Sequence, residues 1–393
     1  MEYQFKTLIV GGGPSGTSCG ISLLNLGHDC CIVDRHTFPR VKLCAGLFTG
    51  KSQECLRSVL GDVAYAEIIR KSLMSRESEF SLWKGKTSLV TCDLMDDACI
   101  PKSLRSTDCR IMLVDRPVLD ESLIRHFMSL GGVVIEGNAV MDVDFGSKVV
   151  RLSSGDTVRY DNIVAADGAL SLVERKLCAF DKSFVGKGKS SLCLEVNVDR
   201  KDLDVNGVNI YFDVVRGSYA WAFSKGEKVC VGLVKLPWER DVDIKDVMRH
   251  FCDDIGLKNQ DKYKVHGAML PFGNLMVTPA WRDSVYFVGD AAGLVEPLTG
   301  EGIYYALQSG KYAAESIVGG GTDVYINKVS YLHSLIKKGR FYQSLLEMSL
   351  PSRFFFRHAP RNKHFISYFY LTQIEHACLD PFWKIIMRYK RQK

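Results

Sequence analysis

The stretch KTLIVGGGPSGTSCGISLLNLGHDCCIVDR, residues 6–35, decides the fold of this chain. A short apolar run breaks into a glycine turn at residues 11–16, helix-compatible sequence follows to about Gly27, and a second apolar run ends in Asp34. Strand, glycine turn, helix, strand and acid are the parts of a dinucleotide-binding βαβ unit, in the required order and at the required lengths. The sequence therefore predicts an α/β fold built around a bound dinucleotide.

Each residue of this motif has its own physical role. Gly11 permits the tight turn, Gly13 lets the backbone approach a pyrophosphate, and Gly16 lets the helix pack closely on the strand. The helix N-terminus then holds the phosphates, and Asp34 accepts hydrogen bonds from ribose hydroxyls. We assign three further residues of this stretch to the same cofactor: Pro14, Ser15 and Arg35. The motif alone does not separate FAD from NAD, but its N-terminal position favours FAD.

The composition is that of an ordinary globular protein. The 393 residues are 46% hydrophobic and 24% charged, which is enough chain for two or three domains. No segment approaches the roughly 18 to 20 uninterrupted apolar residues of a membrane span, and no signal-peptide pattern is present. Thirteen cysteines without a C-x-x-C pair, and nine histidines without metal-ligand spacing, predict a reducing compartment and no metal site. We therefore expect a cytoplasmic protein.

The C-terminal end carries most of the excess charge. Nine Lys or Arg and two acidic residues lie between residues 353 and 393, whereas the whole chain has a formal net charge of +6. Aromatic side chains are interleaved at 354–356, 368–370 and 382–383. One interpretation is peripheral contact with an anionic membrane surface, on the inner face. The other, which we prefer, is a helical appendage that packs its aromatics on the main body.

A loop rich in proline, glycine and charge follows Asp34. It leaves the cofactor strand at the carboxyl end, where such folds bind ligands. Lys42, Cys44 and Ala45 are candidate cofactor contacts, and Cys44 is the candidate catalytic residue. A thiol beside a flavin donates a proton or tunes the ring, whereas the alternative is an inert buried side chain. Position alone leaves both interpretations open.

A second acidic motif follows a later predicted strand. Residues 149–151 and 157–160 flank a turn and predict a hairpin, and residues 162–166 predict a further apolar strand. That strand ends in Asp167-Gly168, which would set a carboxylate and a bare backbone beside the cofactor. A simple turn is the alternative.

The third acidic motif is Gly289-Asp290, again after an apolar run. A helix is predicted to follow from about residue 301 to 318, ended by the glycines at 319–321. Gly302 and Ile303 would form its N-terminus, a second position suited to an anion.

The hydrophobic pattern changes to a period of two between residues 190 and 235. This alternation predicts an antiparallel sheet, separate from the βαβ layer. Tyr219, Trp221 and Phe223 fall on one face of a strand. They would line a long apolar substrate pocket, or else form a sheet packing face.

These patterns together predict three regions. A discontinuous Rossmann-like domain that binds FAD would comprise residues 1–75, 110–182 and 276–320. An inserted antiparallel β-sheet domain for substrate would comprise residues 76–109 and 183–275. A helical, basic, aromatic-rich region would comprise residues 321–393.

With the three motifs in this order, the chain resembles the FAD-dependent oxidoreductases of the p-hydroxybenzoate hydroxylase fold, over most of residues 1–320. Within that fold it looks most like the geranylgeranyl reductase branch. That branch carries a Lys-x-Cys-Gly-Gly-like loop and a Tyr-x-Trp-x-Phe-Pro strand. Residues 42–46 (KLCAG) and 219–224 (YAWAFS) match them, except that Ala45 replaces a glycine and Ser224 replaces the proline.

The resemblance implies roles for individual residues. Asp34 would bind the adenosine ribose, Arg116 would lie against the flavin cofactor, and Asp290 would bind the ribityl chain. Asp167 and Gly168 would belong to the same cofactor site. The helix that starts near Gly302 would point its N-terminus at the flavin, where it stabilises developing negative charge.

The resulting hypothesis is an FAD-dependent reductase that saturates carbon-carbon double bonds in an isoprenoid or similarly apolar chain. Reduced FAD would give hydride to one alkene carbon, and Cys44 or a water that it positions would give a proton to the other. The first alternative is an aromatic hydroxylase using NAD(P)H and oxygen. The second is a flavin-binding lipid-surface protein without turnover.

Other properties follow less directly. The sequence contains no second βαβ unit for a nicotinamide cofactor, so the electron donor is NAD(P)H bound transiently or a ferredoxin-like protein. No nucleic-acid partner is expected. The oligomeric state is open.

Overall fold

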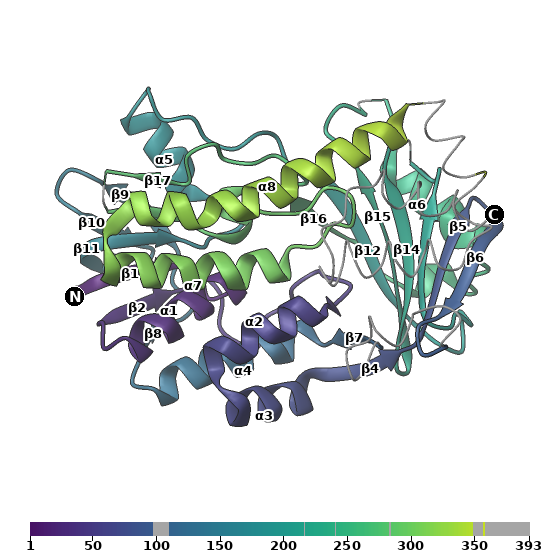
Figure 1. Ribbon diagram of the computed structural model, residues 1–393, viewed down its shortest axis with the longest axis horizontal. Coiled ribbons are helices and arrows are strands. Elements are labelled where there is room, and N and C mark those ends of the chain that lie inside the picture. The colour runs from purple at the N-terminus through teal and green to yellow at the C-terminus, as the bar shows by residue number, and fades with distance from the viewer. Residues whose placement is uncertain (97–109, 216, 240, 283, 349–356, 358–393) are drawn as a thin grey trace, which may run out of the picture.

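The computed structural model describes residues 1–96, 110–215, 217–239, 241–282, 284–348 and 357 (Figure 1). Its described part holds two large sheets and a small one, with most helices packed around the first sheet and the second sheet at the other end of the molecule. The predicted basic, aromatic-rich segment 353–393 lies outside the described residues except for Arg357. Among the described helices, none is long and apolar enough to cross a bilayer.

The first sheet has a parallel core in the order β8-β2-β1-β11-β18. β2 and β18 are short apolar runs whose residues are all buried, as expected in the interior of a parallel sheet. The glycine turn therefore leaves β1 at the carboxyl edge of this sheet. The strands are β1 (Glu2–Val10), β2 (Cys30–Val33), β8 (Val133–Ile135), β9 (Val140–Asp144), β10 (Val149–Leu152), β11 (Thr157–Ala165), β17 (Ala280–Trp281) and β18 (Val285–Phe287).

One strand differs from its prediction. The hairpin strand expected at 157–160 and the apolar strand expected at 162–166 are a single strand, β11. It pairs in parallel with β1 along its whole length, while its first residues also pair antiparallel with β10. Exposed Asp161 interrupts the apolar pattern where the hairpin edge ends, which made one strand look like two.

Helices pack against the first sheet: α1 contacts β1 and β2, α4 contacts β8, and α5 and α8 contact β9 and β17, respectively. α7 lies tightly against α1 because Gly310 has no side chain: a Cβ there would lie 2.2 Å from the carbonyl oxygen of Ser15. The helices are α1 (Pro14–Asn25), α2 (Gly50–Leu60), α3 (Asp62–Ser72), α4 (Arg116–Ser129), α5 (Leu172–Phe180), α6 (Ile244–Asp254), α7 (Ile303–Gly319) and α8 (Gly321–Glu347), with short 3₁₀ helices η2 (Gln260–Lys262) and η3 (Gly289–Ala292).

The second large sheet has the order β16-β12-β15-β14-β13-β5-β6. Its pairs are antiparallel, as the period of two predicts, except for β13 and β5, which run parallel. The strands are β5 (Glu79–Lys84), β6 (Thr87–Asp93), β12 (Ser191–Asp199), β13 (Val208–Phe212), β14 (Tyr219–Lys225), β15 (Lys228–Lys235) and β16 (His266–Leu270). A three-stranded sheet of β3 (Leu47–Phe48), β7 (Ile111–Val114) and β4 (Leu73–Glu77) lies between the two large sheets in sequence and contact.

Both faces of the second sheet are covered. One face packs on α6 through residues such as Leu194, Val231 and Phe251. The other face carries the aromatic side chains of β14 and packs against Leu47 and Leu113 of the small sheet. Every residue of β14 is consequently buried.

α8 runs along the molecule from the first sheet towards the second (Figure 1). Near its start, the Tyr325 hydroxyl donates a hydrogen bond of 2.5 Å to the carbonyl of Phe287 in β18. At its end, Glu347 packs on Gly217, just before β14. One continuous helix thus contacts both large sheets.

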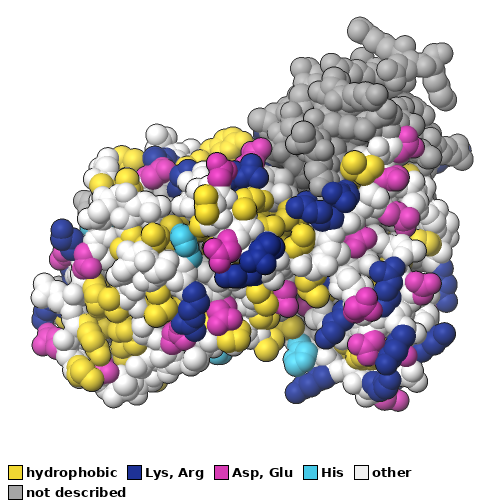
Figure 2. Space-filling model, turned by 90° about the horizontal axis from the view of Figure 1, so that it is seen from below, with side chains coloured by type: hydrophobic (Ala, Val, Ile, Leu, Met, Phe, Trp, Pro, Cys, Tyr) yellow, Lys and Arg dark blue, Asp and Glu magenta, His cyan; other side chains and the backbone are white. Residues whose placement is uncertain are grey.

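The described surface carries both signs of charge. Figure 2 shows Lys and Arg side chains mixed with Asp and Glu over the end of the molecule that holds the second sheet. Many of these charges form exposed pairs, including Lys84 with Asp213 and Lys86 with Asp254. Such exposed pairs contribute little to stability, so this mixture mainly favours solubility.

Candidate functional site

The structure brings the three sequence motifs together at the carboxyl edge of the first sheet. A Cβ on Gly11 would lie 2.3 Å from the carbonyl oxygen of Ala166, the residue before Asp167. A Cβ on Gly289 would lie 3.0 Å from Oγ of Ser15. The glycine turn therefore touches both acidic motifs, at the position where open α/β sheets bind ligands.

The glycine turn has the geometry of a phosphate site. Gly11 has φ +109°, and a Cβ on Gly16 would lie 1.9 Å from the carbonyl oxygen of Gly11, so both positions require glycine. Pro14 is the first residue of α1, and no side chain caps this helix at Gly13. Its first-turn N–H groups are thus available to an anion.

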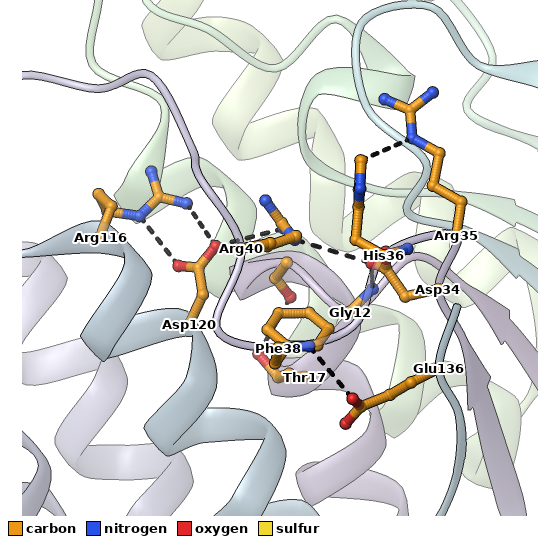
Figure 3. Close-up of polar contacts among 11 residues, drawn as sticks. Gly12, Thr17, Asp34, Arg35, His36, Phe38, Arg40, Arg116, Asp120 and Glu136 are labelled. Atoms are coloured by element: carbon orange, nitrogen blue, oxygen red, sulfur yellow. Dashed lines mark hydrogen bonds and ion pairs between the residues drawn. The ribbon is translucent and has the colours of Figure 1, made fainter. Parts of the chain in front are cut away.

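Asp34 lies at the end of β2 and is held by the turn. Its Oδ2 accepts a hydrogen bond of 2.8 Å from the amide of Gly12, and its Oδ1 accepts one of 2.8 Å from the amide of His36. Arg35, also predicted to contact the cofactor, is exposed and donates to the ring of exposed His36 at 3.1 Å. Asp34 is therefore fixed beside the glycine turn, and a cofactor contact of Arg35 stays a prediction (Figure 3).

Sequence reasoning missed Arg40. Its guanidinium lies 3.9 Å from Oδ2 of Asp34 and 3.3 Å from Oδ2 of Asp120, and a Cβ on Gly13 would lie 3.3 Å from its Nη2. Arg40 thus sits over the glycine turn and links the acid of β2 to α4 (Figure 3). The proline and basic residues of this loop were the available signal.

Arg116, the first residue of α4, completes this row of alternating charges. Its Nε and Nη2 donate to the two oxygens of buried Asp120 at 3.0 and 3.1 Å. Burial disfavours the charged guanidinium, but the nearby Asp120 carboxylate and the Cys44 thiol raise the pKa of Arg116 above its ordinary value. The row Asp34, Arg40, Asp120, Arg116 therefore leads from the ribose position to Cys44.

Asp167 has a structural task besides its predicted role. Its Oδ2 accepts hydrogen bonds from the amides of Leu172 and Val173, at 2.7 and 3.2 Å, and so caps α5. Oδ1 is buried and has no hydrogen-bond partner among the described residues. Burial raises the pKa of this carboxyl. Gly168 beside it has φ +82°, which only glycine adopts without strain.

Asp290 and the N-terminus of α7 meet as the motif predicts. A Cβ on Gly302 would lie 3.7 Å from Oδ1 of Asp290. α7 begins at Ile303, close to the predicted start, and no side chain caps it. Its N-terminus is a second position where N–H groups are available to an electron-rich ligand.

The glycine turn, Asp34 and these two helix ends together suit FAD. Two uncapped helix N-termini face a run of glycine backbone, and an acid at the end of β2 stands where ribose hydroxyls need an acceptor. The turn would hold the pyrophosphate through Gly11 to Gly16, Asp34 would hold the ribose, and Asp290 would hold polar groups further along the cofactor.

Cys44 lies in the loop between β2 and β3. Its Sγ accepts a hydrogen bond of 3.4 Å from the amide of Gly46, whose carbonyl in turn accepts 2.9 Å from the amide of Val114. Cys44 is half-buried and its thiol faces the Arg116 guanidinium. Lys42 is also half-buried, and its charge faces Cys193 on β12. The loop is thereby held to the small sheet with its thiol beside a cation.

The aromatic side chains of β14 form a buried row. Tyr219, Trp221 and Phe223 belong to the cluster against which Ala45 and Leu47 pack. Consecutive rings lie 6.1 and 6.4 Å apart. The Tyr219 hydroxyl donates 2.6 Å to the carbonyl of Thr299, beside the loop before α7. The row is a packing face in this structure, and its role in lining a substrate pocket stays a prediction.

A small pocket reaches the end of the row. It has a volume of about 40 Å³ and is bounded by Tyr219, Pro297 and Leu298 among others. A larger pocket of about 310 Å³ lies on the opposite face of the sheet, against Trp83 and Phe251. The larger one is away from Cys44 and the glycine turn, because its lining residues belong to the α6 face.

Sequence comparison identifies the protein class. The model of the family described as "FAD binding domain" matches residues 4–318. The chain belongs to this FAD-binding family. The match spans both large sheets and contains the glycine turn, Asp34, Asp167 and Asp290, so this family member is an FAD-dependent oxidoreductase.

Curated relatives of this FAD-binding protein include reductases. A menaquinone reductase of Mycolicibacterium smegmatis is 25% identical over 83% of this chain and 79% of its own length. A geranylgeranyl diphosphate reductase of Rhodobacter capsulatus is 26% identical over 80% of this chain and 75% of its own length. Both span the predicted cofactor and substrate regions.

Solved structures show the same fold. A geranylgeranyl bacteriochlorophyll reductase-like protein of Thermoplasma acidophilum superposes with a TM-score of 0.75 at 17% identity, covering 100% of both chains. p-Nitrophenol 4-monooxygenase of Pseudomonas putida superposes with a TM-score of 0.70 at 18% identity, covering 98% of this chain and 99% of its own. The predicted fold family is thereby confirmed.

Within the described residues, no group of three or more His, Cys, Asp or Glu is arranged to hold a metal ion.

Proposed function

We propose that this FAD-dependent oxidoreductase reduces carbon-carbon double bonds in an isoprenoid or similarly apolar chain. One observation carries the proposal: the loop of Cys44 packs, through Ala45 and Leu47, on the buried aromatic row of the second sheet. A thiol beside an aromatic surface suits an apolar substrate that needs a proton. The Rhodobacter capsulatus relative, named a geranylgeranyl diphosphate reductase, supports this substrate class.

The chemistry divides between cofactor and protein. Reduced FAD, when bound, supplies hydride chemistry. An isolated alkene offers no heteroatom to polarise, so the protein must contribute orientation, exclusion of water and one proton. Tyr219, Trp221 and Phe223 supply an apolar wall, and Cys44 holds a proton at Sγ beside Arg116. Cys44 is accordingly the proposed acid, and Arg116 orients its thiol.

Further properties belong to the same proposal. The electron donor is NAD(P)H bound transiently or a ferredoxin-like protein. The protein works in the cytoplasm. Peripheral contact of the basic segment 353–393 with a membrane is the alternative to the helical appendage that we prefer for that segment. Lys42, Asp167, Gly168 and Asp290 contact the cofactor beside the residues of the glycine turn.

The test is an anaerobic titration. The flavin of the purified protein is reduced with dithionite, geranylgeranyl lipids are added, and reoxidation is followed by absorbance, with mass spectrometry of the lipid. Reoxidation with a gain of two mass units per double bond is the expected result. If the lipids leave the flavin reduced, and only air together with a phenol reoxidises it while the phenol gains one oxygen atom, the protein is a hydroxylase instead. A flavin that cellular donors do not reduce, and that neither substrate reoxidises after dithionite reduction, would indicate a binding protein without turnover.

The role of Cys44 has its own variant. Cys44→Ala should retain FAD, because no backbone contact of the glycine turn involves this side chain, but should lose lipid-dependent reoxidation. Cys193→Ala, on β12 nearby, is the control for removal of a half-buried thiol. Full lipid-dependent reoxidation of the flavin in Cys44→Ala would show that Cys44 is not the proton donor.

A further inference from the structure

Two buried charges lie directly beneath the Cys44 loop and have no assigned role. Glu195 on β12 and Lys225 on β14 are 5% and 6% exposed. A Cβ on Gly46 would lie 3.1 Å from Nζ of Lys225, so the ammonium touches the loop two residues after Cys44. Buried charges are costly unless they have a task or a partner.

The sheet register directs Glu195 to the same place. Its neighbours Leu194 and Val196 belong to the cluster on the α6 face, so Glu195 points to the opposite face, towards the Cys44 loop. It is paired across the sheet with Gly232, which has no side chain to separate it from the aromatic row. Glu195 therefore reaches the inner face at the level of Trp221.

The groups around the Glu195 carboxyl come from β12 itself, β14, β15 and the Cys44 loop. The Lys225 ammonium, the Cys230 thiol, the Cys44 amide and the Asn197 side chain all face it. His266 of β16 occupies the paired position on the other side but is exposed. Burial raises the pKa of Glu195, and these groups offset part of that rise.

Cys44 consequently lies between two pairs of opposite charge. On one side, Arg116 is paired with Asp120. On the other, Lys225 faces Glu195. Two unbalanced cations beside a thiol would favour the thiolate, which cannot donate a proton. Arg116 and Lys225 each have a carboxylate nearby, whereas Lys42, whose charge faces Cys193, adds a further cation to this region, so an acid at Cys44 requires both carboxylates.

We propose that Glu195 is a positioning residue that keeps Cys44 in its thiol form by balancing the charge of Lys225. The inference rests on the proposed reductase function for the use of that proton. Donation breaks the S–H bond of Cys44, leaves the electron pair on sulfur and forms one C–H bond of the product. The second C–H bond takes the hydride of reduced FAD, and water returns a proton to the thiolate.

The test measures thiol ionisation without substrate. The FAD-loaded protein is alkylated with iodoacetamide between pH 6 and 10, and the tryptic peptide of residues 43–51, whose one cysteine is Cys44, is quantified by mass spectrometry. Glu195→Gln should move the midpoint of the rate to lower pH by about one unit, a roughly tenfold faster reaction below the midpoint. Lys225→Met should move it to higher pH. Glu195→Asp, which retains the charge, should restore the original midpoint.

The opposite signs separate electrostatics from loose packing. A merely structural role would expose Cys44 in both variants and speed its alkylation in both, which would overturn the proposal, as would an unchanged midpoint in either. If Glu195→Gln fails to retain FAD, Lys225→Met and Glu195→Asp decide by the same criterion. Since no lipid is present, a shifted midpoint stands even if lipids fail to reoxidise the flavin, and the two proposals can fail separately.

Discussion

The indole of Trp221 lies over Gly232 of the neighbouring strand. A Cβ on Gly232 would be 2.3 Å from Cζ2 of that ring, a separation that no packed structure accommodates. The two residues are directly paired between β14 and β15. The absence of a side chain at Gly232 therefore lets the Trp221 ring, the largest of the aromatic row, pack directly on β15. Gly232 is also paired with Glu195 on its other side.

Gly232→Ala should displace the Trp221 ring. Overpacking of a buried site costs roughly 1–3 kcal/mol, so the free energy of unfolding should fall by about that amount and the tryptophan emission should shift. Denaturant unfolding followed by fluorescence measures both. Gly267→Ala on β16 is the control, because a Cβ there makes ordinary contacts, the nearest being Leu194 at 3.4 Å and Leu192 at 3.7 Å. Equal stability of the two variants would contradict the proposed contact.

Gly16→Ala should abolish FAD binding. The added Cβ would lie 1.9 Å from the carbonyl oxygen of Gly11, so the turn must open and the first N–H groups of α1 lose their positions. The purified variant should lack flavin absorbance. Gly319→Ala, where a Cβ meets no atom within 4 Å, should retain it. Normal flavin content in Gly16→Ala would be evidence against this turn as the phosphate site.

Arg40→Met should weaken FAD binding. The variant leaves Asp34 without its nearby cation and removes one of the two guanidinium groups beside fully buried Asp120. Loss of a buried charge partner costs several kcal/mol at most, so we expect the dissociation constant of FAD to rise by about tenfold or more. Fluorescence titration of the apoprotein measures it. Arg249→Met, which removes an exposed arginine of α6, controls for loss of charge, and identical titrations would exclude a role for Arg40.

Stability should fall as the pH rises above about 5, in part because of Glu296. Burial raises the pKa of this carboxyl above its ordinary value of 4.5, although Thr299 donates two hydrogen bonds to Oε2. The folded protein then binds a proton that the unfolded chain releases, and stability is lost as the pH rises through the raised pKa, by at most about 1.4 kcal/mol per unit. Glu296→Gln should flatten this loss as the pH rises above about 5, measured by urea titrations at a series of pH values. Parallel curves for the two proteins would refute the assignment.

Local patterns in the sequence predicted the strand, turn and helix positions around the candidate cofactor site. The glycine turn, Asp34 and the start of α7 each depend on residues close together in the chain, so the spacing of those residues is enough to predict the local geometry. The Arg116–Asp120 pair was also accessible, since residues four apart share a helix face. The family resemblance assigns Arg116 to the flavin and gives no role to Asp120.

Contacts between distant segments could not be predicted in this way. Arg40 pairs with Asp34 at the end of β2 and with Asp120 of α4, and the sequence of its loop does not indicate either partner. Glu195 was missed for a different reason. The alternation of Leu194 and Val196 marked one face of β12 as buried and implied that the other met solvent, whereas the sheet is covered on both faces. The uninterrupted apolar run of β14 was the sign of that double burial.

α8 has a mechanical consequence for substrate entry. Its 27 residues span roughly 40 Å, and it is attached to the first sheet through Tyr325 and to the second through Glu347. Because α8 contacts one sheet near its start and the other near its end, it restrains movement of the two sheets relative to each other. Bending between the sheets would break both attachments, so we expect the angle between them to stay constant through a catalytic cycle. Substrate entry should then depend on the movement of loops rather than on a change in that angle.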